Sequence, residues 1–232
     1  MANGSEPFRA LVIGASGGLG AAIALELERN KNCIDLRRLS RRDDGLDLSQ
    51  EHSVKRAAEM FAADNIQFDI IFNASGILVA GGDAPEKAFR EIDASHLQHA
   101  FAVNSIGAAL AFKYFMPLLK RRERTVFATL SARIGSIGDN RLGGWMSYRA
   151  SKAALNQIVR CAAIEEARRN QRSIIVALHP GTVKTPLTEK FAGGRYTATP
   201  QEAAENLLRV IAGLQPNQSG GFFDYAGRRI EW

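Results

Sequence analysis

Tyr148 and Lys152 stand four residues apart in the stretch YRASK. At that spacing two side chains lie on the same face of a helix, one turn apart. A phenol beside an ammonium group is either an ordinary surface pair or a proton-transfer device. An unperturbed tyrosine has a pKa of about 10, too high for efficient exchange near neutral pH, and a nearby lysine ammonium would lower that pKa. The pair therefore has a catalytic use only if the chain also binds a group that needs a proton.

A glycine-rich turn follows the first apolar segment of the chain. In GASGGLG, the residues Gly14, Gly18 and Gly20 fit the pattern G-x-x-x-G-x-G. Glycine allows a tight turn and a close approach of pyrophosphate to the backbone, and the helix start beyond it favours negative charge. A plain turn has the same composition, but the position after an apolar strand and before a helix favours dinucleotide binding.

The residues after the second apolar segment bear on the choice of cofactor. A cofactor with a free ribose 2′-hydroxyl calls for an acidic residue about twenty positions past the glycine turn. The chain has Ser40, Arg41 and Arg42 there, and two guanidinium groups suit a 2′-phosphate. The alternative is a pair of solvated arginines in a loop, partly neutralised by Asp43 and Asp44. We expect NADP(H) rather than NAD(H).

A nicotinamide cofactor gives the Tyr148–Lys152 pair a purpose. Reduction of a carbonyl needs a hydride on carbon and a proton on oxygen. Tyr148 would exchange that proton, while Lys152 and the positive charge of oxidised nicotinamide would favour the phenolate. Lys152 would also hold the nicotinamide ribose hydroxyls and relay protons.

Strand-like and helical segments alternate along the chain. Apolar segments predict strands over residues 8–14, 33–40, 68–76, 125–131, 173–181 and 220–227. Helices are predicted over residues 18–29, 49–63, about 94–120 and 147–169, and after Thr199, where Pro200 and Glu202 complete a capping box. Apolar strands separated by helices indicate a mainly parallel sheet with helices on both faces. The sequence thus predicts a single doubly wound Rossmann-type α/β domain over residues 1–232.

Composition excludes several other classes of protein. The chain of 232 residues is long enough for one sizeable core, and 46% hydrophobic with 23% charged residues is typical of a globular protein. The net charge of +6 is scattered, and the longest basic run, residues 120–124, reads as a solvated helix end, so we expect no nucleic-acid partner. His96 and His99 lack a supporting ligand cluster, so no metal site is expected. Cys33 and Cys161 lack CxxC spacing and are expected to be free thiols. With no signal-peptide pattern and no stretch of eighteen apolar residues, we expect a cytoplasmic protein without membrane association.

The stretches GASGGLG, NASG, VNSIG, YRASK and HPGTVKTP follow one another in the order of a known family. On them the chain resembles the short-chain dehydrogenase/reductases over nearly its whole length. The stretches SARIGSIGDN and GGWMSYRASKAALN also look like the carbonyl-reductase branch related to C-factor and Sniffer proteins.

The resemblance implies a role for each matching residue. Tyr148 would be the general acid in reduction and the base in oxidation, tuned by Lys152, and Asn104 would hold a water in the proton relay. Asp47 would contact the adenine. Cofactor contacts are implied for Gly14, Ser16, Gly18, Leu19, Gly20, Ser40, Arg41, Arg42, Asp47, Leu48, Asn73, Ala74, Ser75, Gly76, Tyr148, Lys152, Pro180, Gly181, Thr182, Val183 and Thr185. Bland alternatives are that Asn104 is a polar residue tolerated in a helix and that Thr182 and Thr185 only cap a turn.

The carbonyl-polarising serine is the main departure from the family pattern. In the family it stands thirteen residues before the tyrosine and three before a glycine. Here the first count falls on Gly135 and the position three before Gly135 is Ala132. We favour Ser131, at the end of the strand, over Ser136 as the catalytic serine. A smaller departure is the segment Asn73–Gly76, which replaces the family's Asn-Asn-Ala-Gly.

The resemblance places substrate specificity in a short loop at about residues 186–197. Gly193 and Gly194 would let this loop move as a lid. Trp145, Met146 and Ile77 are candidates for an apolar wall, with core packing as the alternative.

We expect an NADPH-dependent carbonyl reductase acting on ketones, aldehydes or quinones and on the corresponding alcohols. The alternative is a regulatory or signalling protein that binds NADP(H) with little turnover. In the family the long helices here predicted over residues 94–120 and 147–169 commonly pair between subunits, which implies a homodimer or homotetramer.

Overall fold

Six parallel strands form one sheet in the computed structural model, which describes residues 6–79 and 84–232. The strands are β1 (Phe8–Ile13), β2 (Cys33–Leu39), β3 (Ile70–Asn73), β4 (Thr125–Leu130), β5 (Ser173–His179) and β6 (Phe222–Asp224). Their order across the sheet is β2-β1-β3-β4-β5-β6, and every neighbouring pair is parallel. The order reverses between β1 and β3, and ligands of such sheets bind at the carboxyl ends of the strands at this point.

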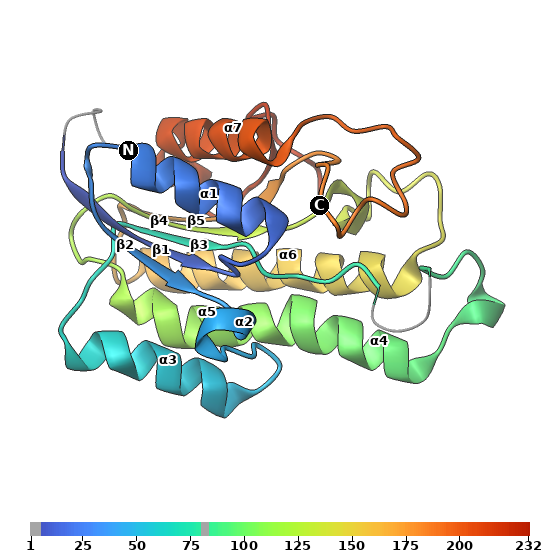
Figure 1. Ribbon diagram of the computed structural model, residues 1–232, viewed down its shortest axis with the longest axis horizontal. Helices are drawn as coiled ribbons and strands as arrows, with labels where there is room; N and C mark the ends of the chain where they lie inside the picture. The colour runs from blue at the N-terminus through green and yellow to red at the C-terminus, as the bar shows by residue number, and fades with distance from the viewer. Residues whose placement is uncertain (1–5, 80–83) are drawn as a thin grey trace.

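Helices cover both faces of the sheet (Figure 1). They are α1 (Gly18–Arg29), α2 (Arg41–Asp44), α3 (Glu51–Ala63), α4 (Ala94–Phe101), α5 (Gly107–Phe115), α6 (Met146–Ala167) and α7 (Pro200–Gly213). In Figure 1, α1 and α7 lie above the sheet, and α3, α5 and α6 lie below it. The predicted doubly wound Rossmann-type fold is therefore confirmed.

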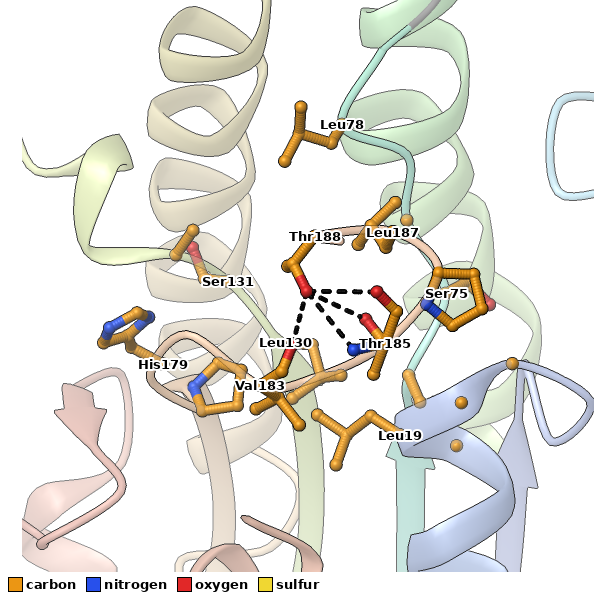
Figure 2. Close-up of a pocket in the computed structure, with 18 of the residues that line it drawn as sticks. Leu19, Ser75, Leu78, Leu130, Ser131, His179, Val183, Thr185, Leu187 and Thr188 are labelled. Atoms are coloured by element: carbon orange, nitrogen blue, oxygen red, sulfur yellow. Dashed lines mark hydrogen bonds between the residues drawn. The ribbon is translucent and has the colours of Figure 1, made fainter. Parts of the chain in front are cut away.

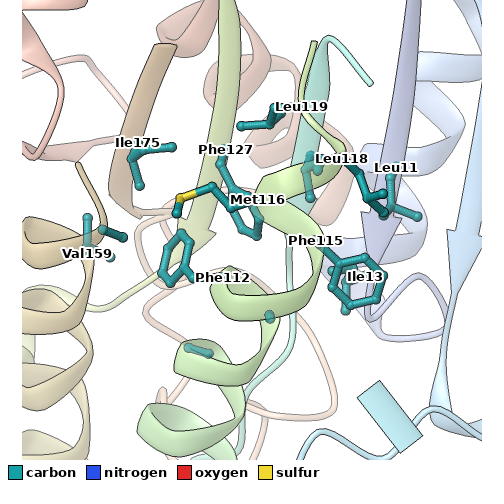
Figure 3. Packing of buried hydrophobic residues seen from close by; sticks show 14 of the residues in the cluster. Leu11, Ile13, Phe112, Phe115, Met116, Leu118, Leu119, Phe127, Val159 and Ile175 are labelled. Atoms are coloured by element: carbon teal, nitrogen blue, oxygen red, sulfur yellow. The ribbon is translucent and has the colours of Figure 1, made fainter. Parts of the chain in front are cut away.

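Each strand contributes side chains to two separate cores because successive residues point to opposite faces. Ala10 and Val12 of β1 pack with α1 and α7, whereas Leu11 and Ile13 pack with α3, α5 and α6. The cluster on the side of α3, α5 and α6 is here called the lower core. Phe127 of β4 reaches the lower core (Figure 3), where its ring lies 4.5 Å from that of Phe112. The side chains on both faces explain the continuous apolar composition of the strands.

The predicted long helix over residues 94–120 is divided in the structure. A π-helical segment, Ala102–Ile106, separates α4 from α5, and a 3₁₀ turn, Met116–Leu118, ends the run. The whole stretch Ala94–Leu118 contains an 18-residue window of mean hydropathy 1.2, so by length and composition it is apolar enough to cross a membrane, although polar residues interrupt it. Half of that window is buried, which shows that its apolar side chains serve the protein core.

Two local features differ from or complete the sequence predictions. Arg41 and Arg42, expected at the end of a strand, open the short helix α2, because the Ser40 hydroxyl caps it by accepting from Asp43 N–H at 2.9 Å. The predicted capping box of α7 is confirmed, since Thr199 and Glu202 bond reciprocally.

Cys33 and Cys161 are free, as expected.

Candidate functional site

The glycine turn between β1 and α1 leaves its backbone open. Gly14 has a φ of +82°, and a Cβ at this position would lie 2.8 Å from the Ser75 hydroxyl. A Cβ at Gly20 would overlap the carbonyl oxygen of Gly14. The N-cap of α1 is Gly17, which has no side chain to cap the first-turn amides. These amides can therefore bind a phosphate, so the turn fits a dinucleotide.

A cavity of about 610 Å³, here called the cofactor cavity, opens at the carboxyl ends of the strands (Figure 2). It is lined by Ser16, Gly17, Gly18, Leu19, Gly20, Ala74, Ser75, Gly76, Leu78, Leu130, Ser131, Ala132, Tyr148, Lys152, His179, Pro180, Gly181, Val183, Thr185, Pro186, Leu187 and Thr188. The structure thus brings together the glycine turn, the NASG segment, the Tyr148–Lys152 pair and the Pro-Gly segment.

Some predicted cofactor residues lie outside this lining: Gly14, Ser40, Arg41, Arg42, Asp47, Leu48, Asn73 and Thr182. Asn73 supports the lining residue Ser75, because its side-chain oxygen accepts from Ser75 N–H at 3.1 Å. Leu48 is buried in the lower core. The Asp47 carboxylate accepts from both the hydroxyl and the N–H of Ser49, and these bonds lower its pKa.

The two predicted phosphate-binding arginines differ in their surroundings. Arg42 forms an ion pair with Asp43, with 2.9 Å between Arg42 Nε and Asp43 Oδ1. Asp44 accepts from Ser40 N–H at 2.8 Å. The exposed Arg41 side chain forms no ion pair among the described residues, although its charge acts at longer range on the Asp47 carboxylate. Of the two guanidinium groups, that of Arg41 is the one without an ion-pair partner among the described residues.

Tyr148 and Lys152 face each other from successive turns of α6. Lys152 Nζ lies 5.9 Å from the centre of the Tyr148 ring and donates to the Leu130 carbonyl at 2.9 Å. Burial lowers the pKa of Lys152 to about 8. Burial also raises the pKa of Tyr148 above its ordinary value. In the protein alone loss of water therefore raises the pKa of Tyr148, and the lowering expected from Lys152 together with oxidised nicotinamide stays a prediction.

Asn104 lies in the π-helical segment, where its side chain is buried and forms hydrogen bonds through both its oxygen and its amide. Its side-chain oxygen accepts from Ile77 N–H, and its amide donates to the Ile77 carbonyl, both at 2.9 Å. The amide also donates to the Ser151 hydroxyl at 3.0 Å. Asn104 therefore joins α6 to the segment that follows β3 and is more than a tolerated polar residue. Single π turns inside helices often occur at functional sites.

The two candidate serines occupy different places. Ser131 lines the cofactor cavity beside Tyr148, and its hydroxyl donates to the Asn156 side-chain oxygen at 2.6 Å. Ser136 is buried away from that lining, and its hydroxyl accepts from Asp139 N–H. Ala132 also lines the cavity and contributes no hydroxyl. The geometry favours Ser131.

A second cavity of about 450 Å³, here called the substrate cavity, adjoins the first and shares Tyr148 with it. Its lining is Leu78, Ala132, Arg133, Ile134, Leu142, Trp145, Tyr148, His179, Gly181, Thr182, Thr188, Phe191, Ala192 and Arg195. The rings of Trp145 and Phe191 meet edge to face at 5.9 Å. Of the expected apolar wall, Trp145 lines this cavity, whereas Met146 and Ile77 do not. The expected substrate loop supplies Phe191 and Arg195.

The start of α6, which positions Tyr148, is fixed by a distant side chain. The buried Glu86 carboxylate accepts from both the hydroxyl and the N–H of Ser147. The N-cap residue itself is Trp145, in the left-handed region with a φ of +53°, and its side chain makes no cap bond. A carboxylate at a helix start is favourable because of the exposed N–H groups there. Sequence reasoning missed Glu86, since its partner is 61 residues away.

His179 is a second residue whose place the sequence did not indicate. It lines both the cofactor and the substrate cavity. Its Nδ1 is buried without a partner among the described residues, and burial lowers its pKa to about 4. Its only sequence signal is its position directly before Pro180.

Thr188 holds the loop beside both cavities. Figure 2 shows its hydroxyl bonded to the Val183 carbonyl and to Thr185.

Solved structures share this fold along almost the whole chain. The carbonyl reductase Sniffer of D. melanogaster is 21% identical, with a TM-score of 0.82 over 98% of this chain and 100% of its own. A putative short-chain dehydrogenase/reductase from Burkholderia multivorans with bound NADP is 26% identical, with a TM-score of 0.80 over 98% and 100%.

Sequence comparisons identify the family. The 1-hydroxy-2-glutathionyl-2-methyl-3-butene dehydrogenase of Rhodococcus sp. is 28% identical over 96% of this chain and 98% of its own. The C-signal of Myxococcus xanthus is 33% identical over 71% of this chain and 92% of its own. A family model described as enoyl-(acyl carrier protein) reductase matches residues 20–213. With the glycine turn, the Tyr148–Lys152 pair and the parallel sheet in place, the chain belongs to the short-chain dehydrogenase/reductase family.

Proposed function

We propose that the protein is an NADP(H)-dependent oxidoreductase that interconverts a carbonyl group and an alcohol on a small molecule, such as a ketone, aldehyde or quinone. The observation that carries this proposal is that Tyr148, Lys152 and Ser131 line the same cavity as the glycine turn. The Rhodococcus relative, named as a dehydrogenase of a 1-hydroxy compound, supports the reaction, and the Burkholderia structure with bound NADP supports the cofactor.

The proton chemistry follows from the environment of two side chains. When bound, the nicotinamide supplies the hydride for the carbonyl carbon. Burial keeps the Tyr148 hydroxyl protonated, which suits a general acid that donates to the carbonyl oxygen. Lys152, with a pKa of about 8, exchanges a proton near neutral pH and can restore that of Tyr148. Its hydrogen bond to the Leu130 carbonyl holds the amine in position for this step.

Ser131 is the proposed second donor to the carbonyl oxygen. Its hydroxyl proton points to Asn156, so the hydroxyl must rotate when substrate binds. A donor aimed at a developing oxyanion contributes about 3 kcal/mol to transition-state stabilisation.

The test is NADPH oxidation with a panel of diketones, quinones, aldehydes and cyclic ketones. Tyr148→Phe is expected to lower kcat at least about 100-fold, because it removes the proton donor, while NADPH binding measured by fluorescence is unchanged. Tyr114→Phe is the matched control, since the Tyr114 hydroxyl bonds Glu51 at the surface and should leave kcat unaffected. Full activity of Tyr148→Phe would contradict the assignment.

The serine assignment is tested in the same assay. Ser131→Ala should lower kcat about 100-fold and Ser136→Ala should leave it within a factor of about two. Tight NADPH binding without turnover on any substrate would instead favour the regulatory function, a possibility that the name of the C-signal relative supports.

A further inference from the structure

The charges around the substrate cavity are of one sign. Within residues 6–79 and 84–232 no aspartate or glutamate lines this cavity, whereas two arginines do, Arg133 and Arg195. The rest of the lining is mostly apolar and includes Ile134, Leu142 and Phe191. A cation at the edge of an apolar cavity interacts more strongly with an anion than one in open water.

The Arg133 charge is already compensated. Its guanidinium lies 3.3 Å from an Asp139 carboxylate oxygen and 3.2 Å from one of Asp224. Asp224 is fully buried and also pairs with Arg228. Arg133 is therefore held in place by its partners and has little charge to offer a ligand.

Arg195 is in the opposite situation. Its backbone N–H donates to the Ala192 carbonyl at 2.9 Å, which closes the turn that carries it. The residue lines the cavity and is exposed, and among the described residues no carboxylate forms an ion pair with its side chain. A planar guanidinium with free N–H groups binds a carboxylate through two parallel hydrogen bonds.

We propose that the preferred substrate is an apolar carbonyl compound bearing a carboxylate, which Arg195 binds while the carbonyl lies at Tyr148. The inference rests on the proposed function, since it names the substrate class of the same site. The apolar body of the substrate would contact Trp145, Phe191 and Leu142. One unpaired guanidinium matches one carboxylate, and the cavity of about 450 Å³ accommodates a substituted aromatic ring.

The kinetic test compares two aldehydes of similar shape, 4-carboxybenzaldehyde and 4-methylbenzaldehyde. Wild type is expected to show the higher kcat/KM with the carboxylate. Arg195→Gln should raise KM for the carboxylate about tenfold, the effect of one charge-assisted contact, and leave the methyl compound within a factor of about two. The matched control is Lys190→Gln, because Lys190 is an exposed cation of the same loop that does not line the cavity. Equal effects on both aldehydes, or an effect of Lys190→Gln as large as that of Arg195→Gln, would overturn the proposal.

A third, polar cavity next to the substrate cavity is an alternative site for the carboxylate. It shares Arg133, His179 and Thr182 with the substrate cavity and contains Arg229, whose side chain has no carboxylate partner among the described residues. A selective loss for the carboxylate in Arg229→Gln, with Arg195→Gln unaffected, would place the anion there and refute the role of Arg195.

Binding separates this proposal from the proposed function. In isothermal titration calorimetry, the protein loaded with NADP⁺ is titrated with 4-methylbenzoate and, separately, with 4-methylbenzamide. This measurement needs no turnover. Tighter binding of the carboxylate, lost in Arg195→Gln but not in Lys190→Gln, would support the anion site even if no aldehyde is reduced. Equal affinity for the acid and the amide would overturn it even if the enzyme proves to be a carbonyl reductase.

Discussion

The buried ammonium of Lys152 makes stability depend on pH. Its pKa falls from 10.5 to about 8 in the folded protein. Between these pH values the unfolded chain still holds a proton that the folded chain has released, so the free energy of unfolding rises with pH. The raised pKa of Tyr148 opposes this trend only above its ordinary value, so the effect should be clearest from pH 8 to about 10.

We therefore expect the free energy of unfolding to rise by about 2 kcal/mol more in wild type than in Lys152→Met between pH 8 and 10. Urea denaturation at several pH values measures this difference. Parallel curves for the two proteins would show that the folded protein keeps Lys152 protonated over this pH range, which means that its pKa is not lowered.

The proposed preference for NADP(H) can be tested at a second pair of residues, Arg41 and Arg42. Because Arg42 is paired with Asp43 and Arg41 has no such partner among the described residues, the two should contribute unequally. Arg41→Gln is expected to raise KM for NADPH about tenfold and leave KM for NADH unchanged. Arg42→Gln, the matched variant, should change the ratio of the two KM values less than threefold or so. The reverse order would assign the 2′-phosphate to Arg42.

At the scale of elements, a long-range contact holds the start of α6, the helix that carries Tyr148. Glu86→Ala removes the partner of Ser147 and leaves the start of α6 uncapped. We expect a loss of about 1–2 kcal/mol in the free energy of unfolding and a lower kcat, since Tyr148 follows Ser147 directly.

Glu91→Ala is the control for the Glu86 prediction. Glu91 is an exposed carboxylate of the same segment that accepts from Lys87 N–H and forms an ion pair at 3.9 Å with the exposed Arg90. Thermal unfolding and kcat measured on both variants separate the effects. A Glu91 variant as impaired as the Glu86 variant would show that the segment as a whole, rather than the cap, positions α6.

The elements that could be predicted are those whose signal lies within a few consecutive residues. The apolar runs of β1 and β5, the capping box at Thr199 and the glycine turn each appear in the sequence at the place where the structure has them. The π-helical segment and the cap from Glu86 depend on contacts between distant residues, so no local pattern indicates them. The same holds for His179 and for the raised pKa of Tyr148, because burial is a property of the assembled fold.

At the scale of the whole molecule, the two cores share one sheet. Alternate residues of β1, β4 and β5 belong to opposite cores, so neither core can lose its packing without disturbing the strands of the other. Residues 1–232 should therefore unfold as a single domain in one cooperative transition. Trp145 and Trp232, the latter stacked on Phe222 at 5.7 Å, report on two separate regions. Their fluorescence and the far-ultraviolet circular dichroism should change at the same urea concentration, and two separate transitions would contradict the single-domain prediction.

The π turn at Ala102–Ile106 also determines where the stretch Ala94–Leu118 can change in length. A π turn closes its hydrogen bonds over five residues where an α turn closes them over four, so it holds one extra residue for about the same rotation. A deletion within the turn that restores regular winding and keeps Asn104 would therefore leave α4 and α5 facing the core as they do now. A deletion within the regular winding of α4 or α5 would instead rotate the residues beyond it by about 100° and carry side chains such as Ala100 or Phe115 out of their buried positions. The loss of one residue should thus be tolerated better at the π turn than in either flanking helix.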